Sequence, residues 1–278
     1  MGDYKISQGY KIGFVSMPEI IGFILSTSRT GTKALAEGLQ GEHVESPHQP
    51  PYSRLLTIVS NYYLHRWISR RTLEWFVRRT REKQIVNSNS RYYLQVFSLD
   101  YLPAKIISEK FQNVYIIHVV RDPRTFVRSY MNWFHTRFKS YVANKYVLGW
   151  HPSGFFTGEM SWREWQQMDE FQRVCWHWKY KNTLLENLFD SYENYMRVRF
   201  EDLFLAQTPE TLKQILHFVG LPYNQRFKSI VEKSKNVSNK KYFQHWDDWD
   251  VERRKQLLII CGEKMKLYGY EKENYPAK

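Results

Sequence analysis

The stretch that decides the fold runs from Ile21 to Leu39 and reads IGFILSTSRTGTKALAEGL. A short apolar run leads into a loop that ends at Gly31, and a helical pattern follows at once from Thr32. Gly31 permits a tight turn and a close approach of the backbone to a ligand. The amides that open the helix lack intrahelical partners and lie at the positive end of the helix dipole. The stretch therefore predicts a strand, a phosphate- or sulfate-binding loop and a helix.

This loop differs from the common nucleotide triphosphatase loop, which ends in Gly-Lys-Ser/Thr. Here Gly31 is followed by Thr32-Lys33-Ala34, and Ser26 stands where the first glycine of that motif would fall. Arg29 adds a fixed positive charge with several donors. A plain strand-to-helix turn with a solvated Arg29 is the alternative. The residues predicted to bind an anion are Ser28, Arg29, Thr30, Gly31, Thr32 and Lys33.

A second unit of strand, loop and helix is predicted over Val114 to Trp133. The pair Asp122-Pro123 is typical of a helix N-cap and its first helical residue. It leaves Arg121 at the carboxyl end of the strand, which is the edge where open α/β sheets bind ligands. Ser129 lies about two helical turns further on, so Arg121 and Ser129 can converge on one oxyanion. The alternative is an arginine bonded to nearby carbonyl groups.

Short apolar segments alternate with longer helical patterns, which is typical of parallel strands joined by crossover helices. The predicted strands are Ile20–Ser26, Ile85–Ser88, Val114–Val120 and Tyr195–Phe200, with a weaker one at His43–Ser46. The predicted helices are Thr32–Leu39, Arg66–Glu82, Leu99–Phe111, Arg124–Phe134, Trp162–Phe189, Pro209–Val219 and Val251–Tyr268. We therefore expect an α/β protein, a single domain over residues 1–278 with a three-layer P-loop-type fold and a central parallel sheet flanked by helices.

The composition favours an anionic partner. The 278 residues include 41 Lys and Arg against 28 Asp and Glu, a formal net charge of +13. No nucleic-acid recognition motif accompanies this charge, so nucleic acid is not the predicted partner. The two cysteines, Cys175 and Cys261, form no metal or redox spacing, and no metal site is predicted. The apolar run Ile20–Leu25 is too short to cross a bilayer and lacks the flanks of a secretory signal, which favours a soluble, cytoplasmic protein.

Together the two loops resemble those of the sulfotransferases that use 3′-phosphoadenosine 5′-phosphosulfate (PAPS). In that family a Lys/Arg-Ser/Thr-Gly-Thr loop binds the 5′-phosphosulfate. A later Arg-Asp/Asn-Pro, with a serine eight residues beyond its arginine, binds the 3′-phosphate. The matching residues are Arg29-Thr30-Gly31-Thr32 and Arg121-Asp122-Pro123 with Ser129. Weaker similarity continues through Trp176–Leu185, Val198–Leu203 and Cys261–Tyr270, so the resemblance spans most of the chain.

The resemblance implies PAPS as the cofactor, 3′-phosphoadenosine 5′-phosphate (PAP) as its product, and a hydroxyl or amine acceptor on a glycan, lipid, phenol or small metabolite. Arg29 would neutralise the leaving phosphate. An acceptor hydroxyl also needs a general base. In many bacterial members of the family, a sequence similar to His-Glu-Pro follows the first loop, whereas this chain has His48-Gln49-Pro50. Because an amide at Gln49 cannot accept the proton, we expect His48 as the base, followed by Glu45 and His43; a hydrogen-bonded loop histidine is the alternative reading of His48.

Two further groups have open assignments. The resemblance suggests a C-terminal loop that closes over the cofactor, with Lys240, Lys241 or Ser238 near its phosphates, and a solvated charge run over Lys233–Lys241 is the alternative. Several indole rings are candidates either for the wall of an acceptor cleft or for the core. They are Trp133, Trp150, Trp162, Trp165, Trp246 and Trp249.

Two other functions compete with sulfuryl transfer. A non-catalytic nucleotide- or polyanion-binding protein is suggested by Gln49 in place of the family's glutamate. A P-loop small-molecule kinase would bind ATP and depend on magnesium, but the missing Gly-Lys-Ser/Thr argues against it. A PAPS-dependent sulfotransferase accounts for both anion loops in their order along the chain, and it is the predicted function.

Overall fold

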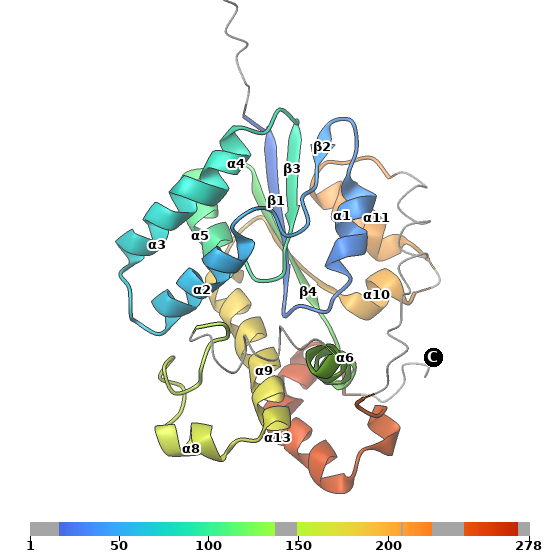
Figure 1. Ribbon diagram of the computed structural model, residues 1–278. Coiled ribbons are helices and arrows are strands. Elements are labelled where there is room, and N and C mark those ends of the chain that lie inside the picture. The colour runs from blue at the N-terminus through green and yellow to red at the C-terminus, as the bar shows by residue number, and fades with distance from the viewer. Residues whose placement is uncertain (1–16, 137–148, 207, 224–241, 272–278) are drawn as a thin grey trace, which may run out of the picture.

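The computed structural model describes residues 17–136, 149–206, 208–223 and 242–271. Five strands form one sheet: β1 Ile20–Ser26, β2 Val44–Glu45, β3 Tyr92–Val96, β4 Val114–Val120 and β5 Tyr195–Arg199. They lie in the order β2-β3-β1-β4-β5, and every neighbouring pair is parallel (Figure 1). The predicted central parallel sheet is confirmed.

Helices follow each strand. The α-helices are α1 Thr32–Leu39, α2 Ser53–Leu64, α3 Arg70–Val77, α4 Lys83–Val86, α5 Tyr101–Lys110, α6 Pro123–Thr136, α8 Trp162–Gln167, α9 Glu170–Phe189, α10 Phe200–Phe204, α11 Glu210–Phe218 and α13 Val251–Leu267. A π-helix, η1, covers Arg78–Glu82 and joins α3 to α4, and a 3-10 turn, η2, covers Trp246–Asp248.

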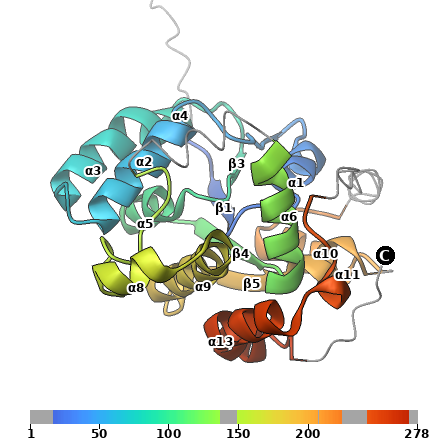
Figure 2. The same ribbon diagram turned by 60° about the horizontal axis from the view of Figure 1, so that its bottom comes forward.

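The sheet is buried on both faces because its strands are nearly continuous apolar runs. On one face, Phe23 and Leu25 of β1 pack with α2, α3, α5 and α9. On the other, Ile24 of β1 and Val119 of β4 pack with α1, α10 and α11. A third cluster lies beyond the end of β4, where α6, α9 and α13 pack together (Figure 2). The architecture has three layers, as the sequence predicts.

The strand order places a natural ligand position between β1 and β4. From β1 the chain goes to one side of the sheet, to β2 and then β3, and from β4 it goes to the other side, to β5. The loops that follow β1 and β4 therefore separate at the carboxyl edge of the sheet. In open α/β sheets, ligands bind at such a point.

One ion pair is buried inside the helical layer. Arg81 and Asp100 are both fully buried, with 2.6 Å between Nη2 and Oδ2. Gln84 and Ser53 accept further hydrogen bonds from the same guanidinium. Arg81 lies in η1, whose wider turn interrupts the regular helix. Asp100 is the residue before α5, so the pair fixes the start of the helix whose first residue, Tyr101, contacts the β1 loop.

The predicted strand at Ile85–Ser88 is wrong. Ile85 and Val86 lie in α4, and the strand of this region is β3, a few residues later. Ile85 is buried because it faces the core from a helix. The true strand contains the buried polar residue Gln95, whose amide donates to the Asp100 carboxylate. That polar side chain interrupts the apolar run by which a buried strand is recognised.

One helix was missed by the sequence analysis, and one predicted helix is divided in two. α2 was not predicted; its N-cap residue, Tyr52, has φ 66° and forms no side-chain cap. The single helix predicted over Trp162–Phe189 is two helices, because Met168 has an extended backbone after the first and Asp169 caps the second in a capping box with Gln172. The helix predicted over Thr32–Leu39 is confirmed with its ends, and the one predicted over Arg66–Glu82 is α3 followed by the π-helix η1. The remaining predicted helices are present with shifted ends. Within the described ranges, no helix combines the length and apolar character needed to cross a bilayer.

Candidate functional site

The loop after β1 is held in shape by its own hydroxyl groups. The oxygens of Ser26 and Thr30 lie 2.6 Å apart, both buried, and the Ser28 amide donates to Ser26 Oγ at 3.2 Å. Beneath the loop, the Tyr101 hydroxyl donates to the Ser26 carbonyl at 2.6 Å. The φ angles of Ser28 and Arg29 are 82° and 58°. A left-handed backbone is strained in residues other than glycine, so the surrounding contacts must hold this loop in shape. Strain of this kind is common at functional sites.

Gly31 is the N-cap residue of α1 and has a left-handed conformation, with φ 69° and no side-chain cap. The first intrahelical bond runs from the Leu35 amide to the Gly31 carbonyl at 3.1 Å. The amides of Thr32, Lys33 and Ala34 therefore have no helical carbonyl to bind. These amides and the helix dipole make the start of α1 a position for an anion.

Replacing Gly31 by alanine tests how tightly this turn is built. A Cβ atom at Gly31 would lie 2.5 Å from Cζ of Phe204, and it would stand at a positive φ. We expect Gly31→Ala to lower the free energy of unfolding by about 1–3 kcal/mol in denaturant titrations. The matched control is Gly262→Ala in α13, where a Cβ meets nothing within 4 Å; it should raise that free energy by about 0.5–1 kcal/mol. Equal effects of the two substitutions would contradict the tight turn.

Arg121, directly after β4, is anchored on several sides. Its Nε donates to Thr125 Oγ1 at 3.0 Å, and its guanidinium lies 4.3 Å from the centre of the Phe200 ring. The Trp178 indole donates to its carbonyl oxygen at 2.8 Å. Burial lowers the pKa of Arg121 to about 10, and the nearby charge of Arg29 acts in the same direction. Arg121 therefore stays cationic at neutral pH and has a fixed position.

Asp122 starts α6 as the sequence predicts. Its carboxylate accepts from the Arg124 amide at 2.8 Å and forms a buried ion pair with the Arg124 guanidinium at 2.5 Å. The Asp122 amide in turn donates to Glu201 at 3.1 Å. Arg124 is thus part of the helix start, whereas Arg121 stands at the end of the strand.

The two loops are in direct contact. Arg121 Nη1 donates to the carbonyl oxygen of Arg29, and Arg29 Nε donates to Ser129 Oγ at 3.2 Å. This is possible because β1 and β4 are adjacent, with Ser26 opposite Val119. Two arginines, a hydroxyl and a helix N-terminus, from stretches far apart in the sequence, therefore meet at one edge of the sheet. Their shared chemistry is the binding of oxyanions.

His48 lies beside the first loop, with 3.2 Å between its Nε2 and Thr32 Oγ1. Backbone pairing with Val96, at the end of β3, holds it there. Burial lowers the pKa of His48, the positive charge of Lys33 lowers it further, and Glu37 raises it. The imidazole is therefore neutral at pH 7 and can accept a proton. The Lys33 side chain itself is exposed and lies 3.7 Å from the Glu37 carboxylate.

The other two candidate bases have different surroundings. Glu45, in β2, accepts a hydrogen bond from Ser88 Oγ at 2.5 Å. His43 is exposed, and its carbonyl pairs with the Tyr92 amide at the start of β3. Gln49 is exposed, with φ 51°. Of these candidates, His48 is the one that the structure joins to the first loop by a side-chain contact.

Some predicted site residues fall elsewhere. Lys240, Lys241 and Ser238 lie outside the described residues. Trp133, Trp246 and Trp249 belong to the cluster of α6, α9 and α13, whereas Trp150 lines a small cavity. Over the described ranges, no group of three or more His, Cys, Asp or Glu side chains is placed to hold a metal ion.

Residues that shape the site were also missed from the sequence. Thr125 follows Arg121 by one helical turn, and this spacing could have indicated their contact. Trp178, Phe200 and Phe204 come from α9 and α10, and only the fold brings them to the two loops. Aromatic residues are so frequent in this chain that their position in the sequence carried no signal.

The comparison with known families identifies the class of protein. The family model of the sulfotransferase domain matches residues 22–243. The chain belongs to the sulfotransferase domain family. A curated relative, carbohydrate sulfotransferase 4 of Mus musculus, is 29% identical over 185 residues, which cover 59% of this chain and 44% of the relative. The chain therefore spans less than half the length of that relative.

Solved structures share the fold. Sulfotransferase STF9 from Mycobacterium avium has a TM-score of 0.53 at 10% identity, covering 91% of this chain and 77% of its own. A sulfotransferase from Alicyclobacillus acidocaldarius has a TM-score of 0.50 at 14% identity, covering 90% and 94%. Mouse sulfotransferase SULT7A1, complexed with PAP, has a TM-score of 0.50 at 14% identity, covering 89% and 85%. The three-layer α/β fold is thus that of sulfotransferases.

Proposed function

We propose that this chain is a PAPS-dependent sulfotransferase, which transfers a sulfuryl group to a hydroxyl or an amine of an acceptor. The observation that carries the proposal is the contact between the two loops, through Arg121 on the Arg29 carbonyl and Arg29 on Ser129. Membership of the sulfotransferase family supports the reaction class. A structure of similar fold, the mouse sulfotransferase, is complexed with PAP.

The residues of the two loops fit a nucleotide with two separate anionic groups. We assign the 5′-phosphosulfate to the first loop, namely Ser28, Arg29, Thr30, Gly31, Thr32 and Lys33, with Lys33 acting through its amide. We assign the 3′-phosphate to Arg121 and Ser129. When bound, PAPS supplies the sulfuryl group and a phosphate leaving group. Lys240 remains a predicted contact of the cofactor.

Arg29 stabilises the negative charge that develops on the leaving phosphate as the sulfuryl group departs. Its guanidinium does not donate a proton at neutral pH, so its contribution is electrostatic and positional. The amides at the start of α1 act on the same oxygens. Because Ser26 and Thr30 already hold the loop in shape, these donors need little rearrangement when the charge appears.

His48 is the general base of the proposal. It is neutral at pH 7, and the contact of Nε2 with Thr32 Oγ1 places it next to the group that binds the phosphosulfate. It takes the proton from the acceptor hydroxyl as the oxygen attacks. Replacing it by glutamine should lower kcat by about 10²-fold or more.

The pH dependence of activity tests this role of His48. The base works when neutral, so kcat/KM should fall as the pH drops through the pKa of His48, which burial and the charge of Lys33 hold below the ordinary value of a histidine. Lys33→Met removes a charge that lowers this pKa and should move the acidic limb to higher pH. Glu37→Gln removes a charge that raises it and should move the limb to lower pH. Shifts in the same direction, or none, in profiles of kcat/KM against pH would exclude His48.

One assay separates the proposal from its competitors. The protein is incubated with PAPS labelled on sulfur and a panel of glycan, lipid, phenol and small-metabolite acceptors, with ATP and magnesium in a parallel series. Label transferred from PAPS supports the sulfotransferase. ATP-dependent transfer would indicate the small-molecule kinase instead. PAP binding in calorimetry without transfer to any acceptor would indicate a non-catalytic nucleotide-binding protein.

A glycan is the acceptor class that we propose first, because the mouse relative is a carbohydrate sulfotransferase. A single domain over residues 1–278 and a cytoplasmic location remain predictions from the sequence. Nucleic acid is not a proposed partner.

A further inference from the structure

A sharp turn ends α13 at the stretch Leu267–Tyr270. Gly269 has φ 74°, and its amide donates to the Lys266 carbonyl at 3.1 Å. The Tyr270 amide donates to the Met265 carbonyl at 2.8 Å, so the helix ends in a Schellman motif. The motif turns the chain back toward the sheet, and the Tyr270 side chain is fully buried.

The Tyr270 hydroxyl lies at the loop after β4. It donates to Glu201 Oε2 at 2.7 Å and lies 3.4 Å from the carbonyl oxygen of Val120, the last residue of β4. The Tyr270 carbonyl oxygen accepts from the Arg124 guanidinium at 3.3 Å. The segment after α13 is therefore joined to the end of β4 and to the first turn of α6.

Glu201 joins this hydroxyl to the same loop. It is the second residue of α10 and is 3% exposed. The strand register sets Arg199 of β5 opposite Val120 of β4, and Glu201 Oε1 accepts from the Asp122 amide at 3.1 Å. Burial raises the pKa of Glu201, whereas its hydrogen bonds with Tyr270 and Asp122 lower it. These two bonds therefore compensate for the burial of the carboxylate.

The two peptide groups that flank Arg121 are both held by this pair. The Val120 carbonyl belongs to the peptide group before Arg121 and faces the Tyr270 hydroxyl. The Asp122 amide belongs to the peptide group after Arg121 and binds Glu201. Because Glu201 uses one oxygen for Asp122 and the other for Tyr270, it holds the backbone at Arg121 and not the guanidinium.

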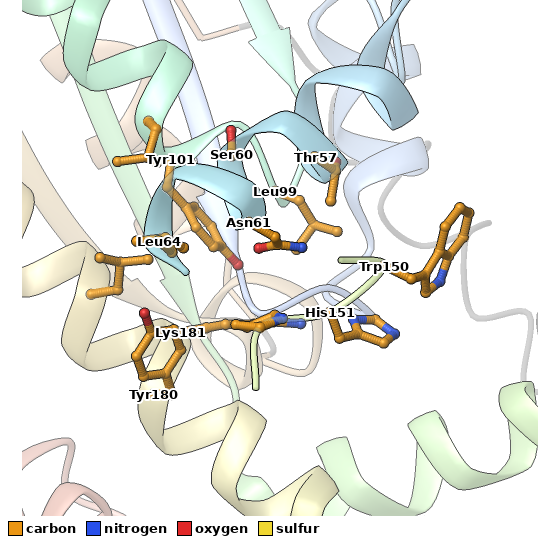
Figure 3. Close-up of a pocket in the computed structure, with 13 residues that line it drawn as sticks. Thr57, Ser60, Asn61, Leu64, Leu99, Tyr101, Trp150, His151, Tyr180 and Lys181 are labelled. Atoms are coloured by element: carbon orange, nitrogen blue, oxygen red, sulfur yellow. The ribbon is translucent and has the colours of Figure 1, made fainter. Parts of the chain in front are cut away.

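The first loop has a matching support. Tyr101 is buried and lines a small cavity together with Asn61 (Figure 3), and its hydroxyl donates to the carbonyl of Ser26 at 2.6 Å. Ser26 is the last residue of β1, as Val120 is the last residue of β4. Each anion loop therefore leaves its strand at a carbonyl group that faces a buried tyrosine hydroxyl.

We propose that Tyr270 and Glu201 are positioning residues for the 3′-phosphate, because they fix the backbone from which the Arg121 side chain extends. The proposal rests on the proposed function, which assigns the 3′-phosphate to Arg121. Groups that bind a ligand must be held to within about 0.5 Å of the productive geometry, and a buried, hydrogen-bonded pair provides that rigidity. The pair therefore contributes to the preference for a nucleotide that carries a 3′-phosphate.

Two nucleotides that differ only in the 3′-phosphate test the proposal, namely PAP and adenosine 5′-phosphate (AMP). PAP binding is measured by calorimetric titration, and AMP binding by competition with PAP. Tyr270→Phe keeps the ring and removes the hydroxyl. It should weaken PAP binding by about 10-fold, the effect of one hydrogen bond to a charged group, and leave AMP binding within about twofold of the wild type.

The matched control is Tyr268→Phe, two residues earlier in the chain. Tyr268 is also buried, and its hydroxyl donates to a carboxylate, that of Glu186, at 2.8 Å. Glu186 forms ion pairs with Lys264 and Arg197. Both variants should lower the thermal unfolding midpoint by a similar amount, about 2–4 °C. Only Tyr270→Phe should change the ratio of PAP affinity to AMP affinity.

Variants of Glu201 separate positioning from the effect of its charge. Burial lowers the pKa of Arg121, and the negative charge of Glu201 acts in the opposite direction. If only this charge mattered, Glu201→Gln and Glu201→Ala would both bind PAP more tightly, because a charge that repels the phosphate is removed. Positioning instead predicts weaker PAP binding, by about 30-fold in Glu201→Ala. The loss should be smaller in Glu201→Gln, which keeps an oxygen for the Asp122 amide. Tighter binding in Glu201→Ala would overturn the proposal.

The same titrations separate this proposal from the proposed function. Equal binding of PAP and AMP by the wild type would overturn the assignment of the 3′-phosphate, and with it both the proposed function and the positioning role. A wild-type preference for PAP that stays unchanged in Tyr270→Phe would overturn the positioning role alone. Equal losses of PAP and AMP affinity in Tyr270→Phe would do the same, since that pattern indicates a structural role.

Discussion

Replacing Arg29 by alanine should lower kcat by about 10²- to 10³-fold, as is found when one charge-stabilising donor is removed from an active site. The reason is that Arg29 lies in the loop between β1 and α1, where its side chain also contacts Ser129. KM for the acceptor should change little, because the proposed role of Arg29 is exerted on the leaving phosphate. The measurement is a steady-state assay of sulfuryl transfer at saturating PAPS.

Two variants sharpen this result. Arg29→Lys keeps the charge that the family often supplies with lysine, and it should retain much more activity than Arg29→Ala. Arg91→Ala removes an exposed arginine that pairs with Glu19 at the opposite edge of the sheet, and it should leave kcat unchanged. If Arg29→Ala kept kcat within about threefold of the wild type, Arg29 would have no role in the transfer step.

Replacing Arg121 by alanine should weaken PAP binding by about 30- to 300-fold in calorimetric titration, the range for losing one charged partner of a buried anion. Because Arg121 Nη1 also holds the Arg29 carbonyl, kcat should fall as well. The sequence alone would divide binding and turnover between the two arginines, but their contact couples them. Unchanged PAP affinity in Arg121→Ala would reject the assignment of the 3′-phosphate.

Variants of Ser129 distinguish two roles of its hydroxyl, which are direct binding of the 3′-phosphate and positioning of Arg29. If Ser129 acts through Arg29, the double variant Arg29→Ala/Ser129→Ala should be no worse in kcat than Arg29→Ala alone. If its hydroxyl also binds the 3′-phosphate, PAP affinity should fall further in the double variant. Both kcat and PAP affinity are measured on the wild type, the two single variants and the double variant.

The sequence predicted the parts of this molecule whose reasons are local. The strand-loop-helix around Arg29 follows from an apolar run, a glycine and a helical pattern within twenty residues or so. Asp122 likewise indicates the start of α6, because an aspartate before a proline is typical of a helix N-cap. The adjacency of these two units depends on the strand order, which places β1 beside β4.

What the sequence could not predict depends on distant partners. Gln95 is polar, yet it lies buried in β3 because Asp100 accepts its hydrogen bond. Ile85 looks like part of a strand, yet it faces the core from a helix. Lys181 lies in α9 among aromatic residues, and nothing local reveals that it is buried. In contrast, Asp169 and Gln172 form a readable capping box that should have divided the long helix.

The ion pair of Arg81 and Asp100 has a consequence for how this chain can change over generations. Losing either charge alone leaves the other in the interior without compensation, at a cost of about 3–5 kcal/mol. That cost is comparable with the whole margin by which many domains remain folded. A viable substitution at one position therefore requires an accompanying substitution at the other, and related chains should carry both residues or neither. Since Tyr101 follows Asp100 and supports the first loop, this constraint in the helical layer also protects the chemistry at the sheet edge.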